Sequence, residues 1–236
     1  MGHTVAGCGR RADRLAEMRS EFGAPHSFFE CDVTDEASVM AFAAALQRAG
    51  PIDVVVSNSG VVESSRCVPW EMDTATFKRV VDVNLHGVQH VTRHLGALLA
   101  AQARLEGAPL KRLINISSGV GHSTSHTMPA YTSSKWAVEA LSKSTAQAIR
   151  ATGLHGRMVC VPLAPGVVAS EMNTMPWAKP VAAWAPGAAR RILGLTPEES
   201  GASITLAKEG YYNREYIATW AIPDGLPLPA RVEVPK

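Results

Sequence analysis

The chain has 236 residues, 46% of them hydrophobic and 19% charged, and its 23 basic and 21 acidic residues give a formal net charge of +2. This balance is typical of a globular protein with a large buried core and lacks the basic footprint of a nucleic-acid-binding protein. The four cysteines are widely spaced, which argues against a disulfide framework or a zinc site, and no apolar run reaches the ~18 residues of a membrane span. We therefore expect one domain over residues 1–236, in the cytoplasm, with no membrane or nucleic-acid partner.

Strands and helices alternate along the chain, and that order predicts an α/β fold with a doubly wound parallel sheet covered on both faces. The run at 52–60, IDVVVSNSG, is continuous and β-branched, as in a buried parallel strand. In chain order, the expected elements are a strand at 3–6, a helix at 12–22, a strand at 26–33, a helix at 35–50, a strand at 52–60, a long helix at 74–105, a strand at 111–119, a helix at 131–153 and a strand at 156–166.

The sharpest chemical signal is a tyrosine and a lysine on the predicted helix at 131–153. Tyr131 and Lys135 are four residues apart and share a helix face. An ammonium beside a phenol lowers the tyrosine pKa from ~10, so that the hydroxyl can exchange a proton with a carbinol or carbonyl oxygen. Ser118 ends a predicted strand thirteen residues earlier and can hold the same oxygen. Taken alone, this spacing is more often that of an ordinary amphipathic helix pair.

The pair belongs to a longer series of motifs that resembles the short-chain dehydrogenase/reductase family over roughly residues 3–175. In the segment DVVVSNSG, Ser57 and Ser59 stand where the family has Asn and Ala. The last sixty residues match only loosely. The matching segments are, in order, CDVTD, DVVVSNSG, VVDVNLHG, INISSG, YTSSK and APGVVASEM.

The resemblance implies a Rossmann-like fold and an NADP-dependent oxidoreductase that interconverts a secondary alcohol and a ketone. It implies that Tyr131 is the general acid/base and that Lys135 lowers its pKa and binds the nicotinamide ribose. Ser118 would polarise the substrate oxygen, and Asn84 would hold a water that relays protons to the lysine. The other cofactor residues that it implies are Asp32 and Val33 at the adenine, Asn58 and Gly60 in the pocket, and Pro165, Gly166, Val168 and Ser170 at the nicotinamide.

The family's first strand, glycine-rich phosphate turn and first helix have no counterpart in the sequence. The opening HTVAGCGRRADRL aligns instead with the second strand and the helix after it, which puts Arg10 and Arg11 where relatives bind the adenosine ribose. Two guanidiniums suit a 2′-phosphate, so NADP is expected rather than NAD. On this alignment we expect a strand end at 5–9, a helix from near Ala12, no phosphate turn at Gly7, and weak NADPH binding.

A rival alignment stays open, because Gly7, Gly9 and Ala12 fit a weak dinucleotide fingerprint with Glu30 and Asp32 about twenty residues later. It would place the opening strand at the centre of the sheet. The sequence is also compatible with an N-terminally shortened reductase, or with a protein that has abandoned the cofactor. The functional alternatives are a non-redox isomerase, dehydratase or cyclase that reuses the Tyr-Lys pair, and a cofactor-free partner subunit.

Histidines form two further groups. His86, His90 and His94 recur every four residues and could share a metal, but we favour a polar helix face or a subunit interface and predict no metal site. Relatives dimerise through this helix, so a homodimer or homotetramer acting on a small carbonyl or alcohol substrate is expected. His122 and His126 lie between Ser118 and the Tyr-Lys helix, and we expect them to shape the substrate mouth.

Overall fold

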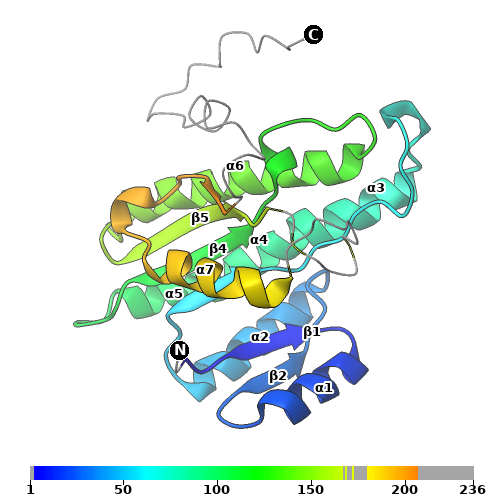
Figure 1. The fold of residues 1–236 in the computed structure, drawn as a ribbon. Helices are drawn as coiled ribbons and strands as arrows, with labels where there is room; N and C mark the ends of the chain where they lie inside the picture. The colour runs from blue at the N-terminus through cyan, green and yellow to red at the C-terminus, as the bar shows by residue number, and fades with distance from the viewer. Residues whose placement is uncertain (1–2, 167, 169–171, 173–179, 207–236) are drawn as a thin grey trace.

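The computed structural model describes residues 3–166, 168, 172 and 180–206 (Figure 1). The expected alternation of strands and helices is confirmed. In the described part of the chain, no helix combines the length and the apolar character needed to cross a bilayer. The elements are β1 (Ala6–Gly9), α1 (Ala12–Phe22), β2 (Ser27–Glu30), α2 (Glu36–Ala49), β3 (Val54–Ser57), η1 (Pro69–Glu71), α3 (Thr74–Val81), η2 (Asp82–His86), α4 (Gly87–Val91), η3 (Thr92–Gly96), α5 (Ala97–Ala103), β4 (Lys111–Ile116), η4 (Gly119–Gly121), α6 (Pro129–Ala151), β5 (Met158–Ala164), α7 (Val181–Leu193), η5 (Pro197–Glu199) and β6 (Ile204–Thr205).

All the strand pairs are parallel, but they form two sheets. One sheet is β1–β2, and the other has the order β3–β4–β5–β6. Figure 1 shows β1 on the side of its sheet that faces the four-stranded sheet. Each of β1 and β3 has one edge with which no strand pairs among the described residues. The parallel strands are therefore interrupted between β1 and β3.

Helices cover both faces of the strands. Figure 1 shows α1 and α7 in front, with α2, α4, α5 and α6 behind. The rear core joins Leu99 of α5 and Val39 of α2 to Leu113 of β4. The front core joins Ile114 of β4 and Val161 of β5 to residues around α7. This is the doubly wound arrangement that the sequence predicts.

The cover is incomplete in front of β3. Val55 points into the rear core and is 6% exposed, whereas its neighbour Val56 is 44% exposed. An apolar strand residue beside a buried one is normally covered in a sheet with helices on both faces. The exposure of Val56 therefore marks the same interruption as the open strand edges.

The long helix predicted at 74–105 is present but not regular. It consists of α3, α4 and α5 joined by two π-helical turns, η2 and η3. A π turn inserts one residue per turn and redirects the side chains that follow it, and such turns are frequent at functional sites. Asn84 lies in the first of these turns and is fully buried.

Candidate active site

The predicted tyrosine and lysine meet at the start of α6. Pro129 begins the helix, Tyr131 lies in its first turn, and Lys135 follows one turn later. The Lys135 ammonium lies 5.5 Å from the centroid of the Tyr131 ring. Lys135 is 3% exposed, and its Nζ donates a hydrogen bond of 2.7 Å to the carbonyl oxygen of Ile116 on β4. The ammonium is thus fixed beside the phenol ring.

The environment of Lys135 makes its charge unusually easy to lose. Burial lowers the pKa of Lys135 from its ordinary 10.5 to about 8, while the nearby carboxylate of Glu139 acts in the opposite direction. The side chain therefore remains mostly protonated at neutral pH. A cation at this position favours the phenolate form of the adjacent Tyr131.

Ser118 lies just beyond β4, at the carboxyl edge of the four-stranded sheet. It begins the short helix η4, and its Oγ accepts a long hydrogen bond of 3.5 Å from the amide of Val120. The turn is pressed onto α6 at Gly121, where an added Cβ would lie 2.6 Å from Ser117 Oγ and 3.2 Å from the Lys135 carbonyl oxygen. Close packing against α6 therefore fixes the turn that carries Ser118.

Asn84 and Gly60 join the same site from two other elements. Asn84 accepts from the Val61 amide and donates to the Val61 carbonyl, both at 2.8 Å, and it also donates to Ser134 Oγ at 3.0 Å. A Cβ on Gly60 would lie 3.5 Å from Asn84 Oδ1 and 3.7 Å from Lys135 Nζ. The buried amide therefore clamps the loop after β3 to α6, and the predicted relay water stays a prediction.

Glu63 is a site residue that the sequence analysis missed. It is buried, and its Oε1 accepts a hydrogen bond of 2.8 Å from the backbone amide of Tyr131. Among the described residues, its Oε2 has no hydrogen-bond partner. The carboxylate caps one of the free amides in the first turn of α6 and so helps to fix Tyr131.

The residues predicted at the adenosine end lie together beside β1 and β2. The Arg10 guanidinium is 3.6 Å from an Asp32 carboxylate oxygen; Arg10 is exposed and Asp32 is half-buried. Asp32 accepts hydrogen bonds from the amide and hydroxyl of Thr34. Val33 is held against α4, since a Cβ on Gly87 would lie 2.7 Å from its side chain. Arg11 is the N-cap residue of α1.

The predicted nicotinamide loop follows β5. Gly166 has φ 76°, a conformation that favours glycine, and the Pro165 carbonyl oxygen accepts a hydrogen bond of 2.8 Å from Trp184 Nε1 of α7. Val168 is half-buried, and Asn58, which directly follows β3, is exposed. Ser170 lies outside the described residues.

The histidine stripe does not converge on one point. His86 contacts Asp82 at 3.1 Å, His90 contacts the Val33 carbonyl oxygen at 2.8 Å, and His94 contacts Glu36 at 2.9 Å. Across the described residues, no group of three His, Cys, Asp or Glu side chains is arranged to hold a metal.

The opening segment forms an ordinary strand and helix. Gly7 lies within β1, where a Cβ would come 2.9 Å from the Phe28 ring, and neither Gly7 nor Gly9 has a positive φ. As expected, α1 begins at Ala12, and no phosphate turn forms at Gly7. Among the residues that the structure describes, β1 pairs only with β2, which argues against the rival alignment because that alignment requires a central strand.

The residues of this site suit the nicotinamide and adenosine ends of a dinucleotide better than its central diphosphate. Lys135 and Tyr131, with the small Gly60 beside the ammonium, offer polar groups that suit a nicotinamide ribose, and Arg10 and Asp32 offer polar groups that suit an adenosine ribose. Backbone amides of a glycine-rich turn, which hold a diphosphate in this fold, are not found within the described ranges.

Known proteins resemble this chain in sequence and in fold. A family model described as short chain dehydrogenase matches residues 1–180. An NADPH-dependent pterin aldehyde reductase from Arabidopsis thaliana is 33% identical over 214 residues, which are 87% of this chain and 84% of that protein. A cis-4-hydroxycyclohexanecarboxylate dehydrogenase from Sinomonas cyclohexanicum is 30% identical over 183 residues, covering 72% of this chain and 68% of that one.

Two solved structures have the same fold. A short chain dehydrogenase from Mycobacterium smegmatis aligns with a TM-score of 0.70 at 21% identity, over 88% of this chain and 82% of its own. ElxO with NADP bound aligns with a TM-score of 0.72 at 20% identity, over 86% of each chain.

Proposed function

Because this chain belongs to the short-chain dehydrogenase/reductase family, we propose that it is an NADP(H)-dependent oxidoreductase that interconverts a secondary alcohol and a carbonyl compound. The observation that carries the proposal is the buried Lys135 ammonium, 5.5 Å from the Tyr131 ring. Burying an ammonium costs free energy, and a role in proton transfer would account for that cost.

The roles of the residues follow from their chemistry. When bound, the cofactor supplies a hydride, and the protein has to orient the substrate and move one proton. In the reductive direction, Tyr131 donates its hydroxyl proton to the substrate oxygen as the carbonyl becomes an alcohol. Lys135 stabilises the resulting phenolate, and Ser118 donates a hydrogen bond to the same substrate oxygen.

Support for NADP comes from charge. Arg10 carries an exposed guanidinium beside Asp32, at the end of β1, and guanidiniums bind phosphate groups through charge-assisted hydrogen bonds. The Arabidopsis relative, at 33% identity, is named for its NADPH dependence. We propose that Arg10 and Arg11 bind a 2′-phosphate, with Asp32 and Val33 beside the adenine.

The same relative suggests where to look for a substrate, because it is named for reduction of a pterin aldehyde. We propose carbonyl reduction as the direction to test first, beginning with a pterin aldehyde and continuing with cyclic ketones. A direct test is NADPH oxidation at 340 nm across this panel, with Tyr131→Phe as the key variant. Loss of a general acid lowers a rate by roughly 10²–10⁴-fold. Equal activity of parent and variant would refute the assignment.

Within the described ranges no glycine-rich turn offers amides to a diphosphate, and this favours one alternative, a non-redox isomerase, dehydratase or cyclase that uses the Tyr131–Lys135 pair for proton transfer. Such an enzyme converts its substrate without added or co-purified nicotinamide. Mass spectrometry of the product separates the two functions, because reduction adds two hydrogen atoms and isomerisation adds none.

An apolar surface between α3 and α6 supports the expected self-association. A hollow of about 610 Å³ is lined by Met72, Phe77 and Pro129 among others, and Trp70 beside it is 84% exposed. Exposed aromatic patches of this kind commonly mark protein interfaces. We propose that a second copy covers this face in a homodimer. Sedimentation of the parent and of Trp70→Ser tests the proposal. We expect the mass of a dimer for the parent and a lower average mass for the variant, and the same mass for both proteins would contradict the proposed interface.

A further inference from the structure

A second buried charge lies behind the Tyr131–Lys135 pair. Glu139 follows Lys135 by four residues and Tyr131 by eight, so all three project from one face of α6. Its side chain is only 4% exposed. A buried carboxylate is unfavourable unless charged or hydrogen-bonding groups compensate it. The proton transfer proposed above does not itself use this residue.

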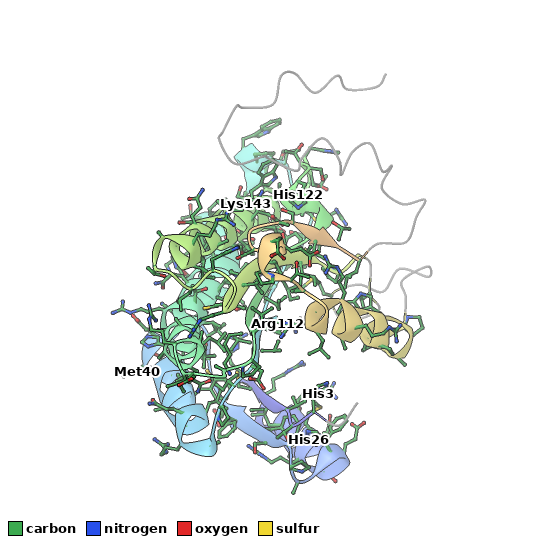
Figure 2. All side chains as sticks on the ribbon, turned by 90° about the vertical axis from the view of Figure 1, so that its left-hand side faces the viewer. His3, His26, Met40, Arg112, His122 and Lys143 are labelled. Carbon is green, nitrogen blue, oxygen red and sulfur yellow. The ribbon has the colours of Figure 1, made fainter. Side chains whose placement is uncertain are left out.

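Groups from three other segments of the chain surround Glu139. His122 Nε2 lies 3.0 Å from Oε1, although the contact is not aligned as a hydrogen bond. Ser203, just before β6, donates a hydrogen bond of 2.6 Å to Oε2, and the Ser117 hydroxyl faces the same carboxylate. Lys143 Nζ is 4.0 Å from Oε2. Figure 2 shows His122 and Lys143 close to one another beside this helix.

These surroundings keep Glu139 ionised. Burial alone would raise the pKa of Glu139, but His122 and the hydroxyls of Ser117 and Ser203 lower it below its ordinary value. The charged or titratable groups that face it are Lys135 and Lys143 from α6 and His122 from the end of η4. Of these, Lys135 is the most deeply buried cation and depends most on a nearby negative charge.

Glu139 also packs against the turn that carries Ser118. A Cβ on Gly121 would lie 3.2 Å from Glu139 Cγ, so η4 rests directly on this side chain. His122, which ends η4, then reaches the carboxylate. Glu139 therefore contacts the serine-bearing turn on one side and lies one helical turn from the lysine on the other.

We propose that Glu139, oriented by His122 and Ser203, is a positioning residue that keeps the Lys135 ammonium charged beside Tyr131. The role rests on the proposed function, in which Tyr131 and Lys135 transfer the proton. An opposite charge one helical turn away offsets part of the desolvation that a buried ammonium suffers.

The test is a direct titration of Lys135 in the full-length protein. Lysine labelled with ¹³C at Cε reports its own protonation by NMR, and the Lys135 resonance is identified by its absence in Lys135→Met. In Glu139→Gln, which keeps the shape but removes the charge, we expect the Lys135 midpoint to fall by about one pH unit or more, a tenfold change in acidity. If the protein reduces a carbonyl, the alkaline limb of its kcat profile should move by the same amount.

The matched control is Glu36→Gln. Glu36 also forms a Glu–His contact, with His94 at 2.9 Å, but it begins α2 and is partly exposed. Its removal should leave the Lys135 midpoint in place.

A merely structural role predicts lower stability and an unchanged midpoint in Glu139→Gln, and that result would overturn the proposal. If this variant does not fold, Glu139→Asp takes its place, because the shorter carboxylate moves away from Lys135. A lowered midpoint then supports the proposal, and an unchanged one overturns it. The titration needs no cofactor or substrate, so an inactive protein would count against the proposed function alone.

Discussion

Replacing Lys135 by methionine should make the protein more stable at neutral pH while abolishing proton transfer. Burial lowers the pKa of Lys135 from 10.5 to about 8, so the unfolded chain holds the proton more tightly than the folded one. At pH 7 the folded state carries this charge at a disadvantage of about 3 kcal/mol. Methionine removes that disadvantage but leaves the Ile116 carbonyl oxygen without its 2.7 Å donor, which costs about 1 kcal/mol. The expected net gain is about 2 kcal/mol.

The sign of the pH dependence makes this prediction specific. Between pH 8 and 10.5 the unfolded parent binds more protons than the folded parent, so the stability of the parent rises with pH in that window. The methionine variant lacks this gain, and its advantage should fall to about zero near pH 10. Urea unfolding at pH 7, 8, 9 and 10 measures the difference, with Lys78→Met as the exposed control. The same difference at pH 7 and pH 10 would refute the buried-charge argument.

Three further changes test other parts of the molecule. Gly121→Ala places a methyl group 2.6 Å from the Ser117 hydroxyl oxygen, so it should lower the free energy of unfolding by about 1–3 kcal/mol and reduce turnover. The control is Gly187→Ala on α7, which has open space around it and should be neutral or stabilising in thermal unfolding. Converting Arg10 and Arg11 to Ala should weaken NADPH binding by about 1.5–3 kcal/mol for each lost contact and leave NADH binding unchanged; equal loss for both cofactors in calorimetry would contradict the 2′-phosphate assignment. Leu99→Ala empties a fully buried core position and should lower the free energy of unfolding by about 2–5 kcal/mol, measured in urea.

The close approach of Tyr131 and Lys135 could be predicted from sequence because its geometry is local. Tyr131 and Lys135 are one helical turn apart, and helix periodicity alone places them on one face. The strand that ends at Gly9 and the helix that begins at Ala12 were also predictable, from the spacing to the CDVTD segment and from the arginines in the first turn of the helix. The parallel sheet likewise follows from the alternation of elements.

The groups that support the pair were not predictable in the same way. Glu63 caps the amide of Tyr131 across 68 residues of sequence, and no local pattern marks it as a cap. The contact of His122 with Glu139 was missed, and the expectation that His122 shapes the substrate mouth stays a prediction. The π turn around Asn84 was also missed, because the hydrophobic period of residues 74–105 fits an uninterrupted helix equally well.

Arg10 and Asp32 lie at the two-stranded sheet, whereas Tyr131 and Lys135 lie on α6, which packs against β4 and β5 of the four-stranded sheet. A continuous ladder of backbone hydrogen bonds would hold the two sheets rigidly, but here side chains between helices help to hold them, such as Glu36 of α2 against His94 and Arg93 of η3. Contacts of this kind are partly exposed and break at lower free energy than a buried ladder. The β1–β2 unit should therefore open locally and exchange its amide hydrogens well before those of β4 and β5. A ligand that contacts both sheets would stabilise the closed arrangement and slow this exchange.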